Sequence, residues 1–466
     1  MNPQHDATVQ SLQTQIADYY ARKVPFRVYH GSTNSTRVLT FKRSEMVDIS
    51  TLNNVLSIDT AKRTVVVEPN VPMDKLVNAT LKYGLVPPVV PEFPGITIGG
   101  AIQGAAAETS SHTYGCVSQT VNWIDYILGD GSLVRTSPEE HADLFYGSAG
   151  SYGSLGLITA TEVNLVPATK YVKVTHYQIS SFSEGVELMK KYANQGSDFV
   201  EWYMFSKTRG AVVIGTMTNE VAGRLLRFSR PHDNWYFLYV KSIAAKGKPV
   251  TDSMPLKDYL FRFNRGAFWA AEIGFKDYGL PFNRLVRFLF DPLLRTRKLY
   301  QVLQESAASQ SYICQDIMLP EQGMVPFLDY MDKEFNMYPL GGCPIKPEPR
   351  SPLQCNGMDT DLVFNLGVYG LRVEPYEKFV AANRQIEAKT NELGGKKWFY
   401  SHNYYSADEF WKVYDKPWYD ALRTKYKAVT LPDIFTRTRV TEQYKVSKRR
   451  GVLRTVFGIA KLRITD

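Results

Sequence analysis

Glycine and other small residues crowd into one stretch of this sequence, Pro91 to Gly115 (P-E-F-P-G-I-T-I-G-G-A-I-Q-G-A-A-A-E-T-S-S-H-T-Y-G). It holds five glycines, three consecutive alanines and a Ser-Ser-His, with no lysine or arginine. Small side chains let a backbone lie directly against a flat or phosphorylated ligand. Close packing between strands is the alternative, because one glycine-rich motif alone more often has that meaning. The stretch therefore predicts either a cofactor wall or a tightly packed core.

A second group of residues suited to anion binding lies near the N-terminus. Phe26 to Tyr29 is typical of a short strand, and His30-Gly31-Ser32-Thr33-Asn34-Ser35-Thr36 follows it. In such a loop, backbone N–H groups and hydroxyls can both donate hydrogen bonds to a phosphate. The same residues also favour an ordinary surface turn.

The elements that would position these groups follow from apolar periodicity and turn residues. In the first third we expect a helix at 6–23, a helix at 73–83 stopped by Gly84, a hairpin across Gly129-Asp130-Gly131 and a strand at 157–166. After Pro167 we expect strands at 172–179, 200–203, 211–217, 312–318, 361–368 and 397–400, and helices at 186–193, 298–306, 323–335 and 376–393. Residues 337–349 are rich in Gly and Pro and are predicted to form a loop.

The length, charge distribution and cysteine spacing of the chain argue against some classes of protein. A chain of 466 residues is too long for one compact core and suggests two or three domains. Seven of the nine net positive charges lie from Arg437 onward, so the body before it is nearly neutral. This argues against nucleic acid binding by the folded part. The four cysteines have no metal-binding spacing, so we expect free thiols in a reducing compartment and no metal site.

The order of the motifs resembles a known family. The strand with its small-residue loop is followed by P-x-x-T-I-G-G, S-S-H-x-Y-G, D-G-S, D-L-F and G-S-L-G, as in the FAD-binding domain of the vanillyl-alcohol oxidase and p-cresol methylhydroxylase superfamily. Three further stretches, Phe199-Val200-Glu201, Gln315-Asp316-Ile317-Met318 and Glu409-Phe410-Trp411, resemble the 24-dehydrocholesterol reductase (Diminuto-like) branch.

The resemblance implies an α+β fold with two main parts. These are a two-part FAD-binding domain of the p-cresol methylhydroxylase type and a mixed α/β substrate domain, an antiparallel sheet with flanking helices. We expect the FAD-binding domain at 1–168, the substrate-binding domain at 169–396, a C-terminal strip returning to the flavin site at 397–436, and a basic tail at 437–466.

The resemblance also implies which residues bind FAD. The first loop would hold the pyrophosphate, the small-residue stretch would line the flavin, and a later glycine group would close over it. The residues concerned are Gly31, Ser32, Thr33, Asn34, Ser35, Thr97, Gly99, Gly100, Gly104, Ser110, Ser111, His112, Gly115, Gly153, Ser154, Leu155, Gly156 and Ile158. Each has a structural alternative, in which the glycines serve only turns and His112 is a hydrogen-bonded core imidazole.

One departure from the family concerns the flavin linkage. Many members have R-G-G-G-H-S in the first loop, and that histidine bonds covalently to the flavin. Here Asn34 stands at that position, and an amide has no ring nitrogen to attack the flavin methyl group. We therefore predict non-covalent FAD, although His30 could substitute from the other end of the loop.

The branch resemblance implies reduction of a carbon–carbon double bond in a sterol-like or isoprenoid substrate, with NADPH as reductant. Flavin N5 would deliver a hydride to one carbon while an acid protonates the other. An isolated alkene needs a strong acid, which a carboxyl kept neutral in an apolar site can supply. Glu201 is the leading candidate, ahead of Asp316 and Glu272; Tyr404 and Tyr405 would suffice only for an alkene conjugated to a carbonyl.

Two other functions stay open at this stage. The same fold supports an oxidase or dehydrogenase of a hydrophobic metabolite, with oxygen as the acceptor. A non-catalytic, flavin-containing lipid-binding protein is the third possibility.

Two basic, apolar segments suggest contact with a membrane surface. Residues 280–298 and 451–463 interleave arginines and lysines with aromatic and aliphatic residues, as amphipathic surface helices do. The alternatives are a helix packed on its own domain and a disordered basic tail. With no signal peptide or membrane-spanning segment seen, we expect the cytoplasmic face, with peripheral attachment to an intracellular membrane.

Overall fold

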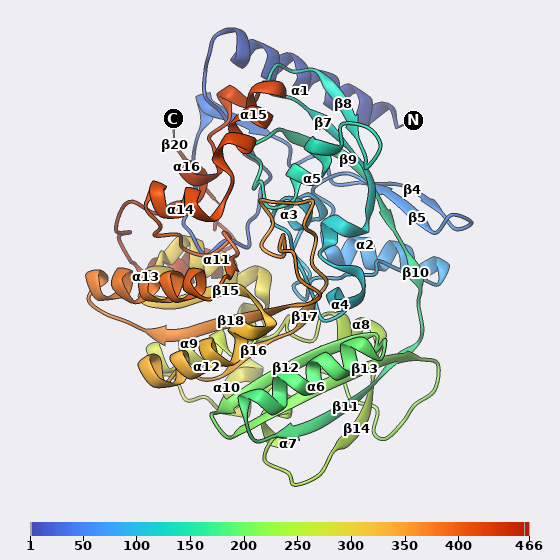
Figure 1. Ribbon diagram of the computed structural model, residues 1–466, viewed down its shortest axis with the longest axis vertical. Coiled ribbons are helices and arrows are strands. Elements are labelled where there is room, and N and C mark those ends of the chain that lie inside the picture. Colours follow the sequence, from blue (N-terminus) through green and yellow to red (C-terminus); the bar gives the residue numbers. More distant parts are fainter. Residues whose placement is uncertain (1, 461, 466) are drawn as a thin grey trace.

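Two β-sheets organise the computed structural model, which describes residues 2–460 and 462–465 (Figure 1). A five-stranded sheet lies in the blue and cyan part of the chain, and a nine-stranded sheet lies in the green to orange part. Helices pack on both. The predicted α+β fold class is confirmed.

The five-stranded sheet has the strand order β4-β5-β9-β7-β8, with every pairing antiparallel. Its strands are β4 (Val55–Asp59), β5 (Thr64–Val67), β7 (Val121–Ile127), β8 (Leu133–Thr136) and β9 (Leu157–Asn164). The predicted Asp-Gly turn joins β7 to β8. Gly84 ends the helical run of α2 (Met73–Thr80) and η2 (Leu81–Tyr83) at φ 68°, as the sequence predicts.

Shorter elements surround this sheet. The buried face of α1 (Pro3–Ala21) follows the predicted helical spacing of Val9, Leu12, Ile16 and Tyr19. The other short elements include η1 (Arg43–Glu45), α5 (Ala142–Ser148) and three small strand pairs. The pairs are β1 (Arg27–Tyr29) with β3 (Met46–Asp48), β2 (Thr40–Lys42) with β20 (Arg463–Thr465), and β6 (Leu85–Val86) with β10 (Val166–Pro167).

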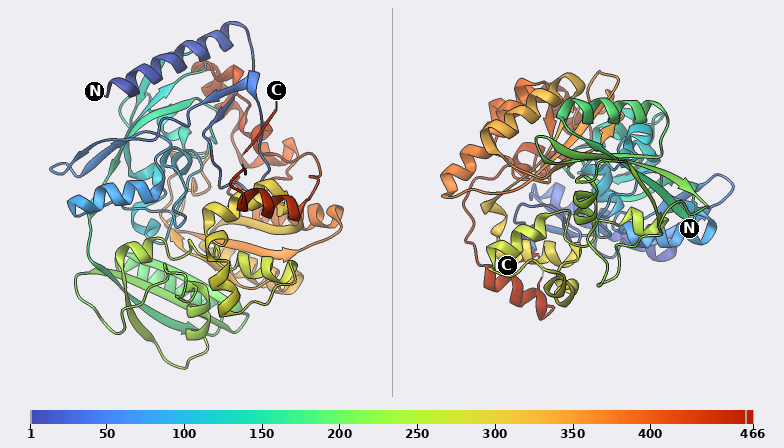
Figure 2. Two further views of the ribbon diagram at one scale, coloured as in Figure 1. Left: turned by 180° about the vertical axis from the view of Figure 1, so that it is seen from behind. Right: turned by 90° about the horizontal axis from the view of Figure 1, so that it is seen from below.

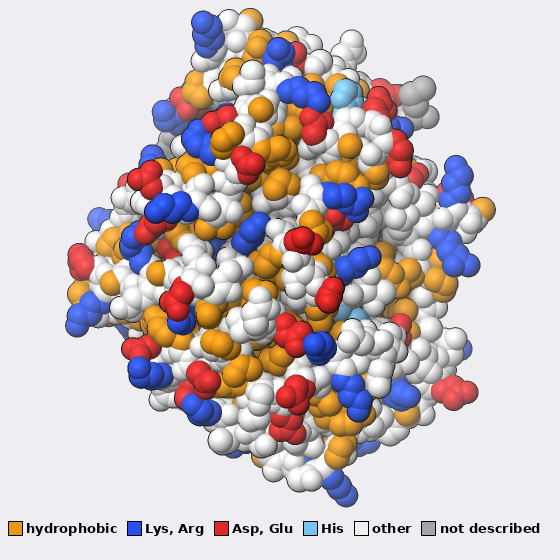
Figure 3. Space-filling view, in the orientation of Figure 1, with side chains coloured by type: hydrophobic (Ala, Val, Ile, Leu, Met, Phe, Trp, Pro, Cys, Tyr) orange, Lys and Arg blue, Asp and Glu red, His pale blue; other side chains and the backbone are white. Residues whose placement is uncertain are grey.

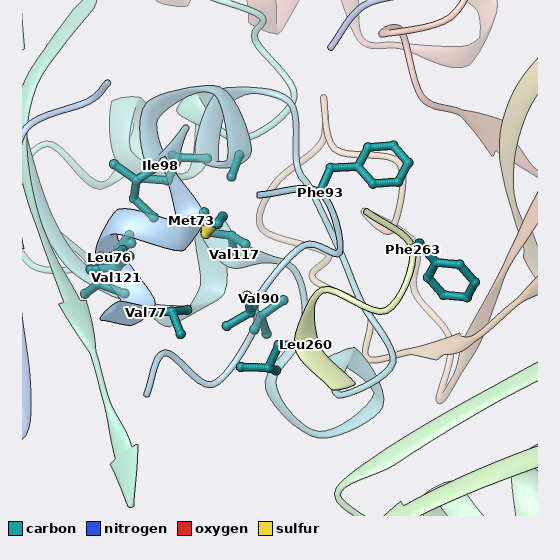
Figure 4. Packing of buried hydrophobic residues seen from close by; sticks show 14 of the residues in the cluster. Met73, Leu76, Val77, Val90, Phe93, Ile98, Val117, Val121, Leu260 and Phe263 are labelled. Carbon is teal, nitrogen blue, oxygen red and sulfur yellow. The ribbon is translucent and has the colours of Figure 1, made fainter. Parts of the chain in front are cut away.

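The small-residue stretch is held from behind by a hydrophobic core. It forms α3 (Ile98–Gln103) and α4 (Ser111–Tyr114), which η3 (Val117–Thr120) follows. Ile98 and Val117 lie beside Met73 and Leu76 of α2 (Figure 4). The branched side chains and Ala101 belong to this core.

The nine-stranded sheet has the order β14-β11-β13-β12-β16-β18-β15-β19, with β17 paired to β18. All of its pairings are antiparallel. Its strands are β11 (Tyr171–Ile179), β12 (Phe199–Ser206), β13 (Arg209–Thr218), β14 (Val250–Pro255), β15 (Tyr312–Pro320), β16 (Leu340–Gly342), β17 (Pro344–Ile345), β18 (Val363–Arg372) and β19 (Lys396–Lys397).

The two faces of this sheet serve different purposes. Three helices, α6 (Phe182–Asn194), α12 (Glu321–Phe335) and α13 (Tyr376–Glu392), pack on one face, where Val200 and Trp202 of β12 join Ile317 of β15 in a core. Because side chains alternate along a strand, Glu201 and Asp316 point to the opposite face. The sheet therefore presents both of these predicted acids on its inner side.

The remaining helices follow β13 along the chain. They are α7 (Tyr236–Ile243), α8 (Leu256–Leu260), α9 (Ala270–Asp277), α10 (Arg284–Leu289), η4 (Asp291–Leu293), α11 (Thr296–Ser306), η5 (Ala308–Ser311), α14 (Ala407–Val413), α15 (Lys416–Lys425), η6 (Ala428–Thr430), α16 (Ile434–Thr438) and α17 (Lys448–Val456). No helix in the described ranges is both long and apolar enough to cross a membrane.

Two local expectations were wrong, and the basic segment for which a surface helix and a disordered tail were both open forms ordered structure. The loop predicted at 337–349 contains β16 and β17, because glycines at 341 and 342 allow strands to approach closely. The strand predicted at 397–400 is reduced to β19 (Lys396–Lys397). The region after Arg437 contains α17, in which Gly451 packs on Ser306 of α11, and β20, which pairs with β2. The four domain limits stay a prediction.

Candidate active site

A cavity of about 570 Å³ lies between the small-residue stretch and the inner face of the nine-stranded sheet. One end, which we call the loop end, is lined by the loop from Ser32 to Thr36 and by Arg27, Arg37 and Arg437. The other, the sheet end, is lined by residues of β12, β15, β16 and β18 and by the aromatic side chains that follow α8. This volume is typical of a site for a cofactor or small ligand.

The loop at 31–35 is held in place by distant parts of the chain. Gly31 has φ 82°, a conformation that residues with a side chain rarely adopt. The Ser35 hydroxyl donates to the Tyr400 carbonyl at 2.7 Å, and Gln304 Nε2 donates to the Ser35 carbonyl at 2.7 Å. The loop is therefore fixed from both sides, and Ser32, Thr33, Asn34 and Ser35 line the cavity.

Three arginines converge on the loop end without a carboxylate. Arg27, Arg37 and Arg437 form no ion pair with any described residue, and each keeps one buried guanidinium nitrogen without a hydrogen-bond partner. Burial lowers the pKa of Arg37 to about 10 and that of Arg437 to about 9, and the positive neighbours add to both shifts. Uncompensated buried cations are costly, so this end of the cavity is suited to a bound anion.

The small-residue stretch forms one wall of the cavity, as predicted for four of its residues. Thr97, Gly99, Gly100 and Gly104 line it. A Cβ atom on Gly99 would come within 2.7 Å of the Pro69 Cβ, so only glycine fits there. Thr97 caps α3, its hydroxyl accepting from the Gly100 N–H at 3.4 Å. Three residues of the later group, Gly153, Gly156 and Ile158, line the cavity as well.

Seven predicted cofactor-binding residues do not line the cavity, and one of them is Gly31 in the first loop. Ser110, Ser111, His112 and Gly115 lie behind the wall, and Ser154 and Leu155 are buried beneath the later glycine group. Both ring nitrogens of His112 face backbone carbonyls, those of Thr109 at 3.0 Å and Ser197 at 2.7 Å. In the structure these side chains hydrogen-bond or pack within the protein, and their part in cofactor binding stays a prediction.

Glu201 is part of a buried ion cluster at the sheet end. Its Oε2 accepts from Arg262 at 2.8 Å and from the Tyr203 hydroxyl at 2.5 Å, and its Oε1 accepts from Tyr236 at 2.9 Å. Arg262 also pairs with Glu108 at 3.0 Å. Both oxygens of Glu201 are therefore engaged by donors, one of which is a cation. The arrangement disfavours it as a proton donor, contrary to the sequence-based ranking.

Asp316 lies on the same wall and is also hydrogen-bonded. Its Oδ2 accepts from Tyr400 at 2.6 Å and Tyr369 at 2.7 Å, and its Oδ1 accepts from Asn365 at 3.2 Å. Burial raises the pKa of Asp316 to about 6, although the three donors oppose this shift. At neutral pH the carboxylate is therefore the main form.

Glu92 is the carboxyl that sequence reasoning missed. It lies in the small-residue stretch and lines the cavity, and no side chain in the described ranges pairs with it. Burial raises the pKa of Glu92 to about 8, and the negative charge of Glu108 adds to the shift. At neutral pH Glu92 is thus mainly a neutral acid that faces the cavity. The sequence signal for this carboxyl was its position in P-E-F-P, within the small-residue stretch.

The other proposed acids lie outside the cavity. Glu272 on α9 is near Lys276, with its Oε1 3.6 Å from Nζ. Tyr404 stacks on His402, and the Tyr405 hydroxyl donates to Asn391 at 2.9 Å. The chain after α13 nevertheless reaches the cavity through Trp398 and Tyr400.

The chemistry of the lining suits an elongated ligand with two different ends. The loop end offers unpaired guanidinium groups, hydroxyls and backbone N–H groups to a phosphate. The wall of small residues admits a flat ring, and the sheet end places neutral and charged carboxyls among aromatic rings. A flavin dinucleotide has this sequence of parts.

Comparison with known proteins identifies the cofactor independently. The family described as FAD binding domain matches residues 6–137. The Delta(24)-sterol reductase of Macaca fascicularis is 29% identical over 442 residues, 90% of this chain and 83% of that protein. That of Arabidopsis thaliana is 26% identical over 457 residues, 89% of this chain and 80% of that protein. Cytokinin dehydrogenase 9 of Oryza sativa subsp. japonica is 30% identical over 138 residues, 29% of this chain and 26% of that protein.

Proposed function

Since the chain is an FAD-dependent oxidoreductase that resembles Delta(24)-sterol reductases over most of its length, we propose that it reduces a carbon–carbon double bond of a sterol-like or isoprenoid substrate with NADPH. The names of these relatives suggest the substrate class. The observation that carries the proposal is Glu92, whose carboxyl lies on the cavity wall with no side-chain partner among the described residues, and whose pKa is raised by burial to about 8.

The residues of the loop end would hold FAD without a covalent bond. Arg27, Arg37 and Arg437 would pair with the pyrophosphate, and Asn34 stands in the loop where a covalent histidine would be needed. Acid precipitation tests the linkage, with the yellow colour expected in the supernatant. Colour that stays in the pellet of the wild type but not of His30→Ala would contradict this and identify His30 as the attachment site.

Reduction of an alkene makes two demands on the site. When bound, reduced FAD supplies a hydride to one alkene carbon. The protein has to deliver a proton to the other carbon. An isolated alkene has no conjugated carbonyl group that could accept the charge developing during this step. The donor must therefore hold its proton at neutral pH and face the substrate.

Glu92 meets this requirement better than the other cavity carboxyls. Its carboxyl is free of side-chain partners and its pKa is raised to about 8, whereas Asp316 accepts three hydrogen bonds and has a pKa of about 6. In our proposal the Glu92 carboxyl donates the proton. Glu201 and Glu108 instead neutralise Arg262, which would otherwise be an unpaired buried cation next to the acid.

Aromatic rings complete the sheet end. Phe263 and Phe268 pack in a tilted arrangement with centroids 4.1 Å apart, and Phe268 stacks on Tyr369 at 5.8 Å. Phe93, labelled beside Phe263 in Figure 4, packs on Phe268 at 5.6 Å. Ring faces stabilise positive charge, here that developing on the alkene carbon as the proton arrives. They also exclude water, which keeps the Glu92 carboxyl neutral.

Anaerobic mixing of the FAD-loaded protein with NADPH tests the direction of the reaction. The reductase predicts rapid bleaching of the flavin by NADPH, followed by recovery of the yellow colour when an alkene substrate is added. Bleaching by an alcohol or amine and not by NADPH would favour an oxidase. No bleaching by any of these would leave a flavin-containing binding protein.

A further inference from the structure

A cluster of exposed apolar side chains lies around α10 and α17. Among the described residues, seventeen large apolar side chains are exposed, and ten of them fall in two short segments. These are Tyr278, Leu280, Leu285, Phe288, Leu289 and Phe290 around α10, and Leu453, Val456, Phe457 and Ile459 on and after α17. Such a concentration is unusual for a surface that faces only water.

The two segments lie side by side in space although they are far apart in sequence. The Tyr278 hydroxyl lies 3.5 Å from the Lys448 carbonyl oxygen, and Lys448 forms an ion pair with Asp277. Both views in Figure 2 place the dark red α17 against the yellow helices of residues 270–306. The segments therefore form one surface, which we call the α10–α17 face.

On this face the acidic side chains are buried, whereas basic side chains are exposed. Its acidic side chains are buried and paired: Asp277 with Arg372 and Lys448, Asp291 with Arg265 and Arg295, and Glu305 with Arg450 and Arg454. Basic side chains, including Arg284 and Arg449, are left at the surface. On the face seen in Figure 3, by contrast, charges of both signs are interspersed.

This distribution of charge favours a lipid surface over a protein partner. Phospholipid headgroups attract Lys and Arg at the rim while aromatic and aliphatic side chains enter the acyl boundary. Leu285 and Phe457 are 66% and 72% exposed, which is ample for insertion. From the apolar cluster and its basic rim, we propose that the α10–α17 face docks on an anionic lipid bilayer.

The cavity opens close to the proposed docking surface. Ile273, Gly274, Asp277 and Tyr278 line the cavity, and Tyr278 is also 41% exposed on the α10–α17 face. The cavity therefore reaches the surface at the place where lipid would lie. A hydrophobic substrate can pass from the bilayer to the site without crossing water; this part rests on the proposed function, whereas the docking itself does not.

Sedimentation with vesicles tests the docking. The FAD-loaded protein is expected to pellet with phosphatidylcholine vesicles that contain phosphatidylserine, and to pellet less at high salt because the rim charges are screened. The double variant Leu285→Ser/Phe457→Ser should bind about tenfold more weakly or worse, since it removes two large inserting side chains. Val429→Ser, which changes a side chain 65% exposed elsewhere, should bind as the wild type does.

Flavin content and size measurements make the outcome decisive. All three proteins should retain the same FAD absorbance, which shows that a loss of binding is not a loss of fold. Wild-type protein that stays in the supernatant at low salt overturns the proposal, as does equal pelleting of the double variant. A wild-type dimer that the double variant converts to monomer, without vesicle binding, would assign the face to a second copy instead. Turnover of detergent-dispersed substrate reports separately on the proposed function.

Discussion

The two ends of the cavity treat buried charge in opposite ways. At the loop end, Arg27, Arg37 and Arg437 lie together with no carboxylate, so positive charge is left over. At the sheet end, Arg262 is shared between Glu108 and Glu201, and Glu92 stays neutral. The first arrangement is complete only when an anion binds, whereas the second is complete in the protein alone.

The difference shows which part of the site depends on the cofactor. An unpaired buried cation raises the free energy of the empty protein and lowers that of the complex with an anion. A paired buried ion instead serves the stability of the fold, because removing one partner leaves an uncompensated charge. The loop end is thus arranged for binding, and the sheet end for holding a proton in a dry, fixed position.

Removing the proposed proton donor should have the largest effect. Glu92→Gln keeps the approximate shape of the side chain but cannot act as a general acid, because an amide does not release a proton in this pH range. We expect turnover of an isolated alkene to fall by about 10²- to 10⁴-fold, the usual contribution of a general acid. Steady-state kinetics measures the fall, and reduction of the flavin by NADPH should keep its normal rate.

Glu272→Gln is the matched control for that variant, because Glu272 lies outside the cavity. Its turnover should equal that of the wild type. Equal losses in both variants would show that the effect of Glu92→Gln is not specific to the cavity.

Breaking the buried ion cluster should have the next largest effect, this time on stability. Arg262→Met leaves Glu108 and Glu201 buried without their cation, which typically costs about 3–5 kcal/mol of unfolding free energy. Denaturant unfolding measures the loss. Lys416→Met, which removes the exposed pair with Asp420, should change stability by less than about 1 kcal/mol.

The double variant Arg262→Met/Glu201→Gln checks the cause. If ion pairing is what matters, it should be less destabilised than the sum of the two single variants, because one uncompensated charge is gone. Simple additivity would argue against the pairing.

The loop end should respond with a smaller change that appears only with cofactor present. Arg37→Met or Arg437→Met removes one charge-assisted hydrogen bond to a phosphate, worth about 1.5–3 kcal/mol, so FAD affinity should fall by about ten- to a hundredfold. Titration of flavin fluorescence measures the affinity. Arg439→Met, which changes an exposed side chain stacked on Phe435, is the control.

The same substitutions should affect the flavin-free protein differently. Because they relieve repulsion between buried cations, apoprotein stability should stay unchanged or rise. A loss of apoprotein stability equal to that of the loaded protein would mean that these arginines are structural.

A last effect is expected on the pH dependence of stability. The folded pKa of Glu92 lies above its ordinary value, so the folded protein holds this proton when the unfolded chain has released it. The Glu92 contribution to stability is therefore present at low pH and is lost as pH rises through about 8. Thermal unfolding of the flavin-free wild type should decline over this range more than that of Glu92→Gln; parallel curves would contradict the assignment.

Local sequence signals predicted much of the fold. Asp130-Gly131 specifies a turn by itself, and Gly84 stops a helix whatever surrounds it. The strands predicted at 200–203 and 312–318 are present as parts of β12 and β15. These features depend only on neighbours in the sequence.

The parts that sequence reasoning missed depend on distant contacts. Arg437 belongs by charge to a basic tail, yet α16 brings it to the cavity beside Gly153. The pKa of Glu92 is raised by burial and by the negative charges of Glu108 and Asp316, which only the folded chain brings near it. Glu201 loses its role as a candidate acid because Arg262, sixty-one residues later, pairs with it. Burial and pairing of this kind have no local pattern.

One experiment tests the central claim most directly. The FAD-loaded protein is reduced under anaerobic conditions with one equivalent of NADPH and then mixed with an isolated alkene of the sterol-like class. The account predicts that the wild type regains its yellow colour in a single turnover, whereas Glu92→Gln, reduced equally fast, stays bleached about a hundredfold longer. Recovery of both proteins at the same rate would contradict it.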